Sequence, residues 1–137
     1  MLQTRSDALL VVVKNTGGNV NAIIETAQMS SNGVALTAGY AVVAASATDN
    51  TVVSAVATRK IRVLAYSLMA VTPVNARWQS GTGAANLLTG FMFLGASGGL
   101  VAPYNPVGWF ETSGNNLLNL KCAAAQSVGG CITYLEI

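Results

Sequence analysis

Histidine is absent from this sequence, and charged residues make up only 9% of its 137 residues. The chain therefore lacks the side chain that proteins use most often as a general base and as a metal ligand. The acidic residues that could act in its place stand in no recognisable catalytic motif. We expect neither an enzyme nor a protein with a bound metal or cofactor. The five acidic residues are Asp7, Glu25, Asp49, Glu111 and Glu136.

Cysteine is scarce as well, and occurs only as Cys122 and Cys131. Two thiols without histidine or a nearby pair of acids cannot complete a zinc site, and a cysteine nucleophile needs a base that the sequence lacks. A turn near Gln126 predicts that the last two strands form a hairpin, which places the two cysteines opposite each other. They are then either two reduced packing residues, as expected in a cytoplasmic product, or a disulfide.

The shortage of charge also bears on partners. Globular chains carry about 25% charged residues, and this chain has too few to cover its whole surface with ionised groups. We therefore expect an oligomer in which part of the surface is buried against other subunits. The net charge is only +2, and the basic cluster of Arg59, Lys60 and Arg62 is far from the dense stripe typical of nucleic-acid binders. We expect no nucleic-acid partner.

Long hydrophobic segments are missing too, although 52% of the residues are apolar. The run at residues 8–13 is too short for the core of a signal peptide. The longest uncharged stretch, residues 78–110, is interrupted by glycine, asparagine, serine and proline, which argues against a membrane span. We expect a protein made in the cytoplasm, without a membrane partner.

What the sequence does contain is a series of short apolar runs separated by turn residues. From residue 49 onward a strand and its turn recur roughly every 8–12 residues, which predicts an all-β, antiparallel sandwich. About eight strands fit into residues 51–137, and eight is the strand number of a jelly roll. We therefore predict a jelly-roll domain over residues 49–137. Residues 1–48 form either an N-terminal arm that docks on another surface or additional strands of the same sandwich.

The longest apolar run, residues 61–71, predicts a central strand. Its two faces, one starting at Ile61 and the other at Leu64, are both mainly apolar and both need a cover. A neighbouring subunit is the simplest cover for the face that points away from the sandwich. Together with aromatic residues further along the chain, that face forms the predicted oligomer interface. Its residues are Leu64, Tyr66, Leu68, Phe91, Phe93, Trp109 and Phe110.

Two later segments show clear alternation. Asn75, Arg77 and Gln79 alternate with apolar or small residues, which predicts a strand with one wet face. Phe91 and Phe93 share one face of the next strand.

Seven short segments follow one another in a recognisable order over residues 48–137. They are Thr48–Val56, Lys60–Tyr66, Gln79–Gly81, Leu88–Gly90, Gly108–Gly114, Asn119–Leu120 and Val128–Tyr134. This order resembles that of small phage virion structural proteins, the jelly-roll family of head-decoration (cement) and fibre-tip proteins. The resemblance implies a non-enzymatic protein of the virion that forms a homotrimer and attaches to the major capsid protein or to another virion protein.

Two other roles stay open. The first is a fibre-tip module that binds a receptor or a glycan, because aromatic residues beside asparagine and aspartate are typical of sugar-binding grooves. The second is the capsid subunit of a small virus. The aromatic residues that could line such a groove are Tyr40, Trp78, Tyr104, Trp109 and Phe110.

Overall fold

A computed structural model describes residues 30–31, 34–84 and 86–137. The apolar run at residues 8–13 and most of the predicted N-terminal arm lie outside these residues. Within the described part every regular element is a strand. In chain order the strands are β1 (Ser30–Ser31), β2 (Val34–Ala35), β3 (Thr37–Ala45), β4 (Asp49–Val53), β5 (Ile61–Ala70), β6 (Val74–Ser80), β7 (Met92–Leu94), β8 (Gly99–Ala102), β9 (Phe110–Glu111), β10 (Leu118–Cys122) and β11 (Val128–Glu136).

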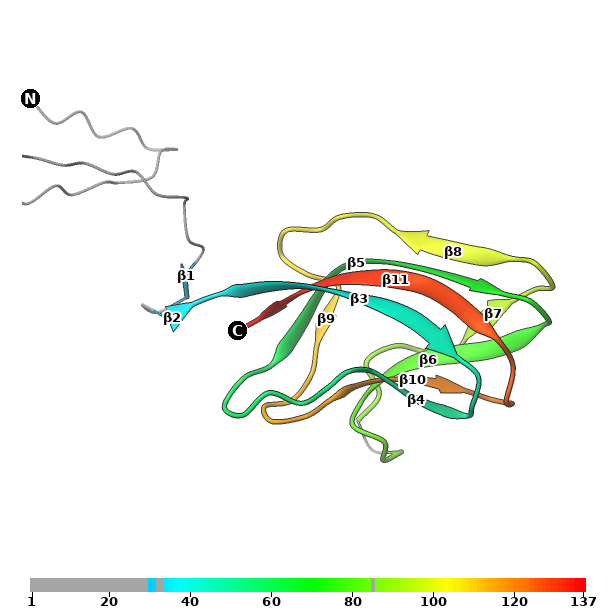
Figure 1. Ribbon diagram of the computed structural model, residues 1–137, viewed down its shortest axis with the longest axis horizontal. Coiled ribbons are helices and arrows are strands. Elements are labelled where there is room, and N and C mark those ends of the chain that lie inside the picture. Colours follow the sequence, from blue (N-terminus) through cyan, green and yellow to red (C-terminus); the bar gives the residue numbers. More distant parts are fainter. Residues whose placement is uncertain (1–29, 32–33, 85) are drawn as a thin grey trace, which may run out of the picture.

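Two antiparallel sheets pack face to face as a sandwich (Figure 1). The larger sheet has the order β3-β11-β5-β8, with β9 pairing the start of β5, and the smaller sheet has the order β4-β10-β6-β7. The first strand of this set pairs with the last, the second with the last but one, and so on inward to the β6–β7 pair. That nested pairing, rolled into two sheets, is the winding of a jelly roll, so the predicted all-β sandwich is confirmed.

The sandwich begins before residue 49. β3 pairs with β11 over its whole length, from Thr37 opposite Glu136 to Ala45 opposite Val128, and forms one edge of the larger sheet. A strand from the predicted N-terminal segment is therefore the first strand of the jelly roll. The predicted division near residue 48 does not coincide with an edge of the sandwich.

The last two long strands do not form the predicted hairpin. β10 pairs with β4 and β6 in the smaller sheet, whereas β11 pairs with β3 and β5 in the larger one. The connection between them crosses from one sheet to the other. Cys122 therefore faces the core and is fully buried, while Cys131 lies on the outer side of the larger sheet, and both thiols are free.

A β-bulge decides which side chains of β5 face inward. The register against β11 shifts between Thr133 and Tyr134, so that Leu64 is the extra residue. A bulge of one residue exchanges the two faces of a strand beyond it. Ile61 and Val63 face the core before the bulge, and Tyr66, Leu68 and Ala70 face it afterwards. After the bulge, the residues of β5 that face outward are Ala65, Ser67 and Met69.

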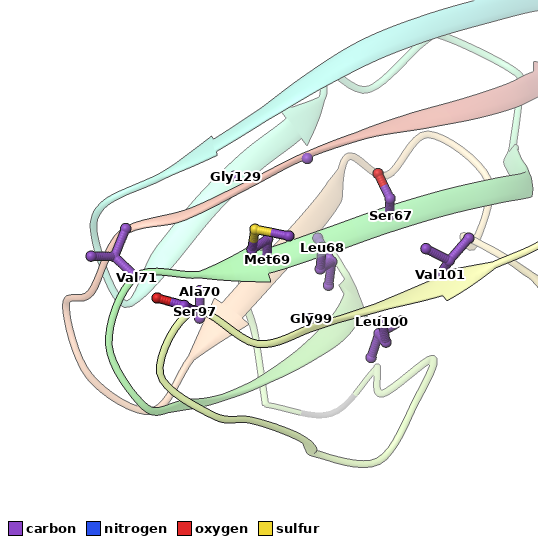
Figure 2. Close-up of a pocket in the computed structure, with 11 residues that line it drawn as sticks. Ser67, Leu68, Met69, Ala70, Val71, Ser97, Gly99, Leu100, Val101 and Gly129 are labelled. Atoms are coloured by element: carbon purple, nitrogen blue, oxygen red, sulfur yellow. The ribbon is translucent and has the colours of Figure 1, made fainter.

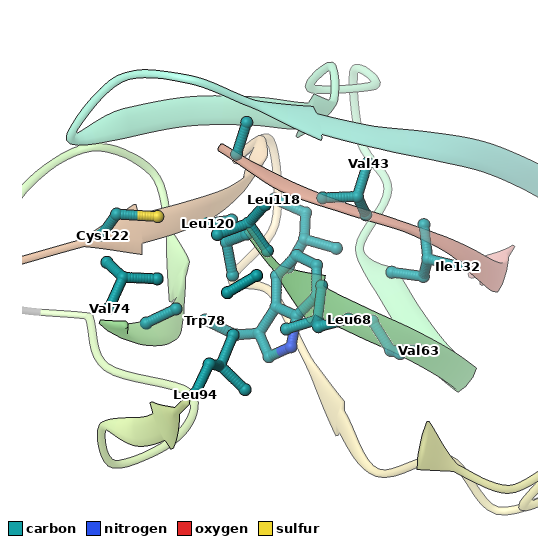
Figure 3. Packing of buried hydrophobic residues seen from close by; sticks show 14 of the residues in the cluster. Val43, Val63, Leu68, Val74, Trp78, Leu94, Leu118, Leu120, Cys122 and Ile132 are labelled. Atoms are coloured by element: carbon teal, nitrogen blue, oxygen red, sulfur yellow. The ribbon is translucent and has the colours of Figure 1, made fainter. Parts of the chain in front are cut away.

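The core lies between the sheets and is centred on Trp78 (Figure 3). The indole is fully buried and packs edge-on against Tyr66, with ring centroids 5.5 Å apart, and beside Phe110 at 6.0 Å. Leucines from both sheets close around it: Leu68 and Leu94, with Leu118 and Leu120 of β10.

Candidate interaction surface

Two acidic side chains of the described domain, Glu111 and Asp49, form surface ion pairs. Glu111 binds Lys60 at 3.0 Å and Arg62 at 2.8 Å, and Asp49 binds Lys121 at 2.5 Å. Nowhere among the described residues do three or more histidine, cysteine or acidic side chains gather closely enough to hold a metal ion.

The Glu111 ion pair gives a prediction about acid stability. The hydrogen bond from Lys60, together with that from Arg62, outweighs desolvation and holds the pKa of the Glu111 carboxyl below its ordinary value of 4.5. A folded-state pKa below the unfolded one means that the pair stabilises the fold above pH 4.5 and loses this effect as the pH falls through the folded pKa.

We expect Glu111→Gln to cost less than about 1 kcal/mol at neutral pH, because the pair is partly exposed. It should also flatten the loss of stability on the acid side. Urea denaturation at a series of pH values from neutral to acidic measures both effects. An unchanged acid-side slope in the variant would show that this pair does not contribute.

The outer faces of the two sheets differ in polarity. The smaller sheet presents the ion pair between Asp49 and Lys121, next to Arg77 and Asn75 of β6. Asn75 and Arg77 point outward as the alternation predicts, and Gln79 shares their face but is buried. This is an ordinary polar sheet surface.

The larger sheet presents the opposite kind of surface. Beyond the bulge the strand register aligns the outward residues in rows, two of which cross all four strands, and none of these residues is charged. The outward Arg62 and its ion-pair partner Glu111 lie before the bulge, at the β9 end of the sheet. Val42, Met69 and Val101 are 64%, 60% and 74% exposed. We call this surface the larger-sheet face. Its residues are Tyr40, Val42 and Ala44 of β3, Gly129, Cys131 and Thr133 of β11, Ala65, Ser67 and Met69 of β5, and Gly99 and Val101 of β8.

The larger-sheet face is hollowed at one end. A depression of about 780 Å³ lies around Met69, between Gly129 on one side and Gly99 and Val101 on the other. Figure 2 shows Ser67 and Val101 on the outer side of the sheet, with Leu68 and Leu100 directed the other way. Glycines deepen the depression because they place no side chain in it. We call it the β5 hollow.

The structure separates the predicted interface residues into two groups. Leu64 and Leu68 are only 6% and 2% exposed, so their predicted place on an exposed second face of the strand is wrong. Leu68 faces the core because of the bulge, and the loop after β8 crosses the strand at Leu64, where Asn105 N donates to Leu64 O. Tyr66 and Phe110 are also turned inward, against Trp78.

The other three predicted residues lie at the surface. Phe93 is 81% exposed on β7, and Phe91 lies beneath the Arg77 guanidinium, 4.5 Å from it. Trp109 is 47% exposed in the loop after β8, where its indole N–H donates to Pro103 O. Their role in an interface stays a prediction. Sequence reasoning missed Val42, Met69 and Val101, whose outward direction depends on the sheet register and the bulge.

The two cysteines should differ in reactivity. Cys122 is fully buried, and this burial raises the pKa of its thiol, whereas Cys131 is half-buried beside Ser67 Oγ at 3.3 Å. Since the thiolate is the reactive form, we expect a thiol reagent to modify Cys131 in the folded chain and Cys122 only on unfolding. Mass spectrometry of the modified peptides measures this. Equal rates at both positions would contradict the placement of Cys122.

The fold and this surface together define a jelly-roll domain with one uncharged, hollowed sheet face. Comparison of the chain with known protein families, curated proteins and solved structures finds no match. No helix in the described part of the chain is long and apolar enough to cross a membrane.

Proposed function

We propose that the chain is a non-enzymatic structural protein of a phage or virus particle, a decoration protein that associates with copies of itself and binds the shell. The observation that carries this proposal is the larger-sheet face. Beyond the bulge it carries no charge on any of its strands, although its side chains are directed toward solvent.

The extent of the face supports an assembly role. The larger-sheet face spans about five residues along each of the three longer strands and three residues of β8, and it covers roughly 300 Å² in projection. The largest apolar patch on a monomer measures about 300–600 Å² and is often functional. Burying apolar area contributes roughly 25 cal/mol per Å², although the costs of association consume much of that. Such a face suits a subunit of a particle, which can bury it against a neighbour.

The proposal is tested on particles produced from the genome that encodes the chain. Gradient-purified particles are examined by immunogold microscopy with an antibody against the purified chain. We expect regular labelling of the particle surface in many copies. Particles that lack the chain would refute the proposal. Shells formed by the purified chain alone, in negative stain, would instead identify a capsid subunit.

A second candidate, a glycan-binding fibre tip, is favoured by the surroundings of Trp109. This half-exposed indole borders a small hollow of about 210 Å³ that is also lined by Arg62 and Glu111. An aromatic plane beside a paired arginine and carboxylate suits a sugar ring, although aromatic side chains also serve packing. Binding on a glycan array that disappears in Trp109→Ala would favour this role over decoration.

A further inference from the structure

The shape of the β5 hollow restricts what can cover the larger-sheet face. Interfaces between proteins pack at their centre as densely as protein interiors. Two copies that placed their hollows against each other would enclose a large empty volume, since each hollow measures about 780 Å³. The surface that fits must therefore project outward. An apolar surface suits the hollow, because its lining is mainly apolar residues and glycines, with Ser67 and Ser97 as its polar members.

The chain carries such a projection on its other sheet. Phe93 is 81% exposed, the highest value among the exposed large hydrophobic side chains of the described residues. It stands on β7, the edge strand of the smaller sheet, opposite Asn75 of β6. Phe91 lies close by, beneath the cationic head of Arg77. Aromatic side chains and arginine are enriched at protein interfaces.

We infer that Phe93 of one copy inserts into the β5 hollow of a second copy. This inference rests on the self-association in the proposed function and names its contact. A volume of this size lies in the range of pockets that enclose groups larger than one side chain, so a phenyl ring together with part of its strand can enter. The hollow places no charge against the ring.

Such a contact joins two different patches, so it forms either twice in a reciprocal twofold dimer or once between successive copies, head to tail. Head-to-tail contacts close into a ring when the rotation between neighbours allows it, and otherwise continue as a filament. Each copy then offers one Phe93 and one hollow, and both are used.

Two substitutions at exposed positions test the contact. Val101→Glu places a charge in the hollow, and Phe93→Glu removes the projection. Because Val101 and Phe93 are 74% and 81% exposed, neither variant should change the melting temperature of the isolated domain by more than a few degrees. Size-exclusion chromatography with light scattering at micromolar concentration should show an oligomer for the wild-type chain and a monomer for each variant.

The mixture of the two variants is the decisive sample. Phe93→Glu copies keep an intact hollow, and Val101→Glu copies keep an intact Phe93, so one contact can still form between them. We expect the mixture to give a species of twice the monomer mass. Val107→Glu is the matched control, since Val107 is 76% exposed but lies outside the hollow, and it should keep the wild-type mass.

Three results would overturn the inference: a monomeric wild-type chain, an oligomeric Phe93→Glu variant, or a mixture that stays monomeric. The second of these would indicate face-to-face packing or another contact surface. A monomeric wild-type chain would also remove self-association from the proposed function, whereas the virion role is tested separately by immunogold labelling of the particles.

Discussion

Replacing Trp78 with alanine is expected to destabilise the domain by about 3–5 kcal/mol, the range for removing a large aromatic side chain from a core. The indole is fully buried, and it touches residues of both sheets rather than one. Tyr66 and Phe110 lose their ring partner at 5.5 and 6.0 Å. Since small domains have a total stability of about 5–15 kcal/mol, the variant should be close to unfolding at room temperature.

Urea denaturation followed by far-ultraviolet circular dichroism measures this effect. Trp109→Ala is the control, because it removes the same side chain from a position that is 47% exposed. It should lower the free energy of unfolding by much less than Trp78→Ala. Similar losses for both tryptophans would mean that the core is not centred on Trp78.

Alternation predicted the strand faces correctly wherever the strand was regular. In β6, Asn75 and Arg77 face outward as expected, because a period of two fixes the direction of every side chain once one is known. Gln79 shares their face, but it is buried and not in solvent as predicted. In β7, Phe93 and Leu94 likewise fall on opposite faces, 81% and 4% exposed. Strand number and the sandwich class followed from the same regularity.

The bulge at Leu64 is the reason that the predicted interface was partly wrong. Both faces of residues 61–71 are apolar, so the sequence holds no signal for a change of face in the middle of the strand. Before the bulge the predicted inward set is correct, and after it the two sets exchange. Leu68 therefore belongs to the core, and Met69 takes its place on the outside.

The pairing of the last strands failed for a topological reason. Consecutive strands are neighbours in roughly two thirds of cases, which made a hairpin between β10 and β11 the natural expectation. In this fold they lie in different sheets. The long-range pairing of β11 with β3 places β11 in the larger sheet, and no local sequence pattern near Gln126 indicates that pairing.

The low charge of the whole chain predicted an uncovered surface but could not locate it. Charge is not spread evenly over the two sheets: the smaller one carries Asp49, Arg77 and Lys121, whereas the larger one carries Arg62 and Glu111 at its β9 end and no charge on the larger-sheet face beyond the bulge. Only the register that aligns Val42, Cys131, Ser67 and Val101 in one row makes this visible. The candidate surface is thus a property of the fold rather than of any motif.

Substitution of Gly130 by alanine should destabilise the domain by about 3–5 kcal/mol, from a strained backbone and an overpacked contact together. Gly130 has a φ of +153°, which side chains rarely adopt. A Cβ there would overlap Ser67 O and would lie 2.8 Å from Ser67 C on the neighbouring strand. Both atoms are backbone, so β5 and β11 would have to move apart.

Gly129→Ala is the control, because it should raise the free energy of unfolding where Gly130→Ala lowers it. Gly129 is exposed on the larger-sheet face, and the nearest atom to an added Cβ is Val43 O at 4.0 Å. Alanine there restricts the unfolded chain without strain in the folded one, which stabilises by about 0.4–1 kcal/mol. Urea denaturation of both variants in the Val101→Glu background keeps association from contributing. If Gly129→Ala were the more damaging of the two, the glycines would have exchanged roles, and β11 would present its other face to the β5 hollow.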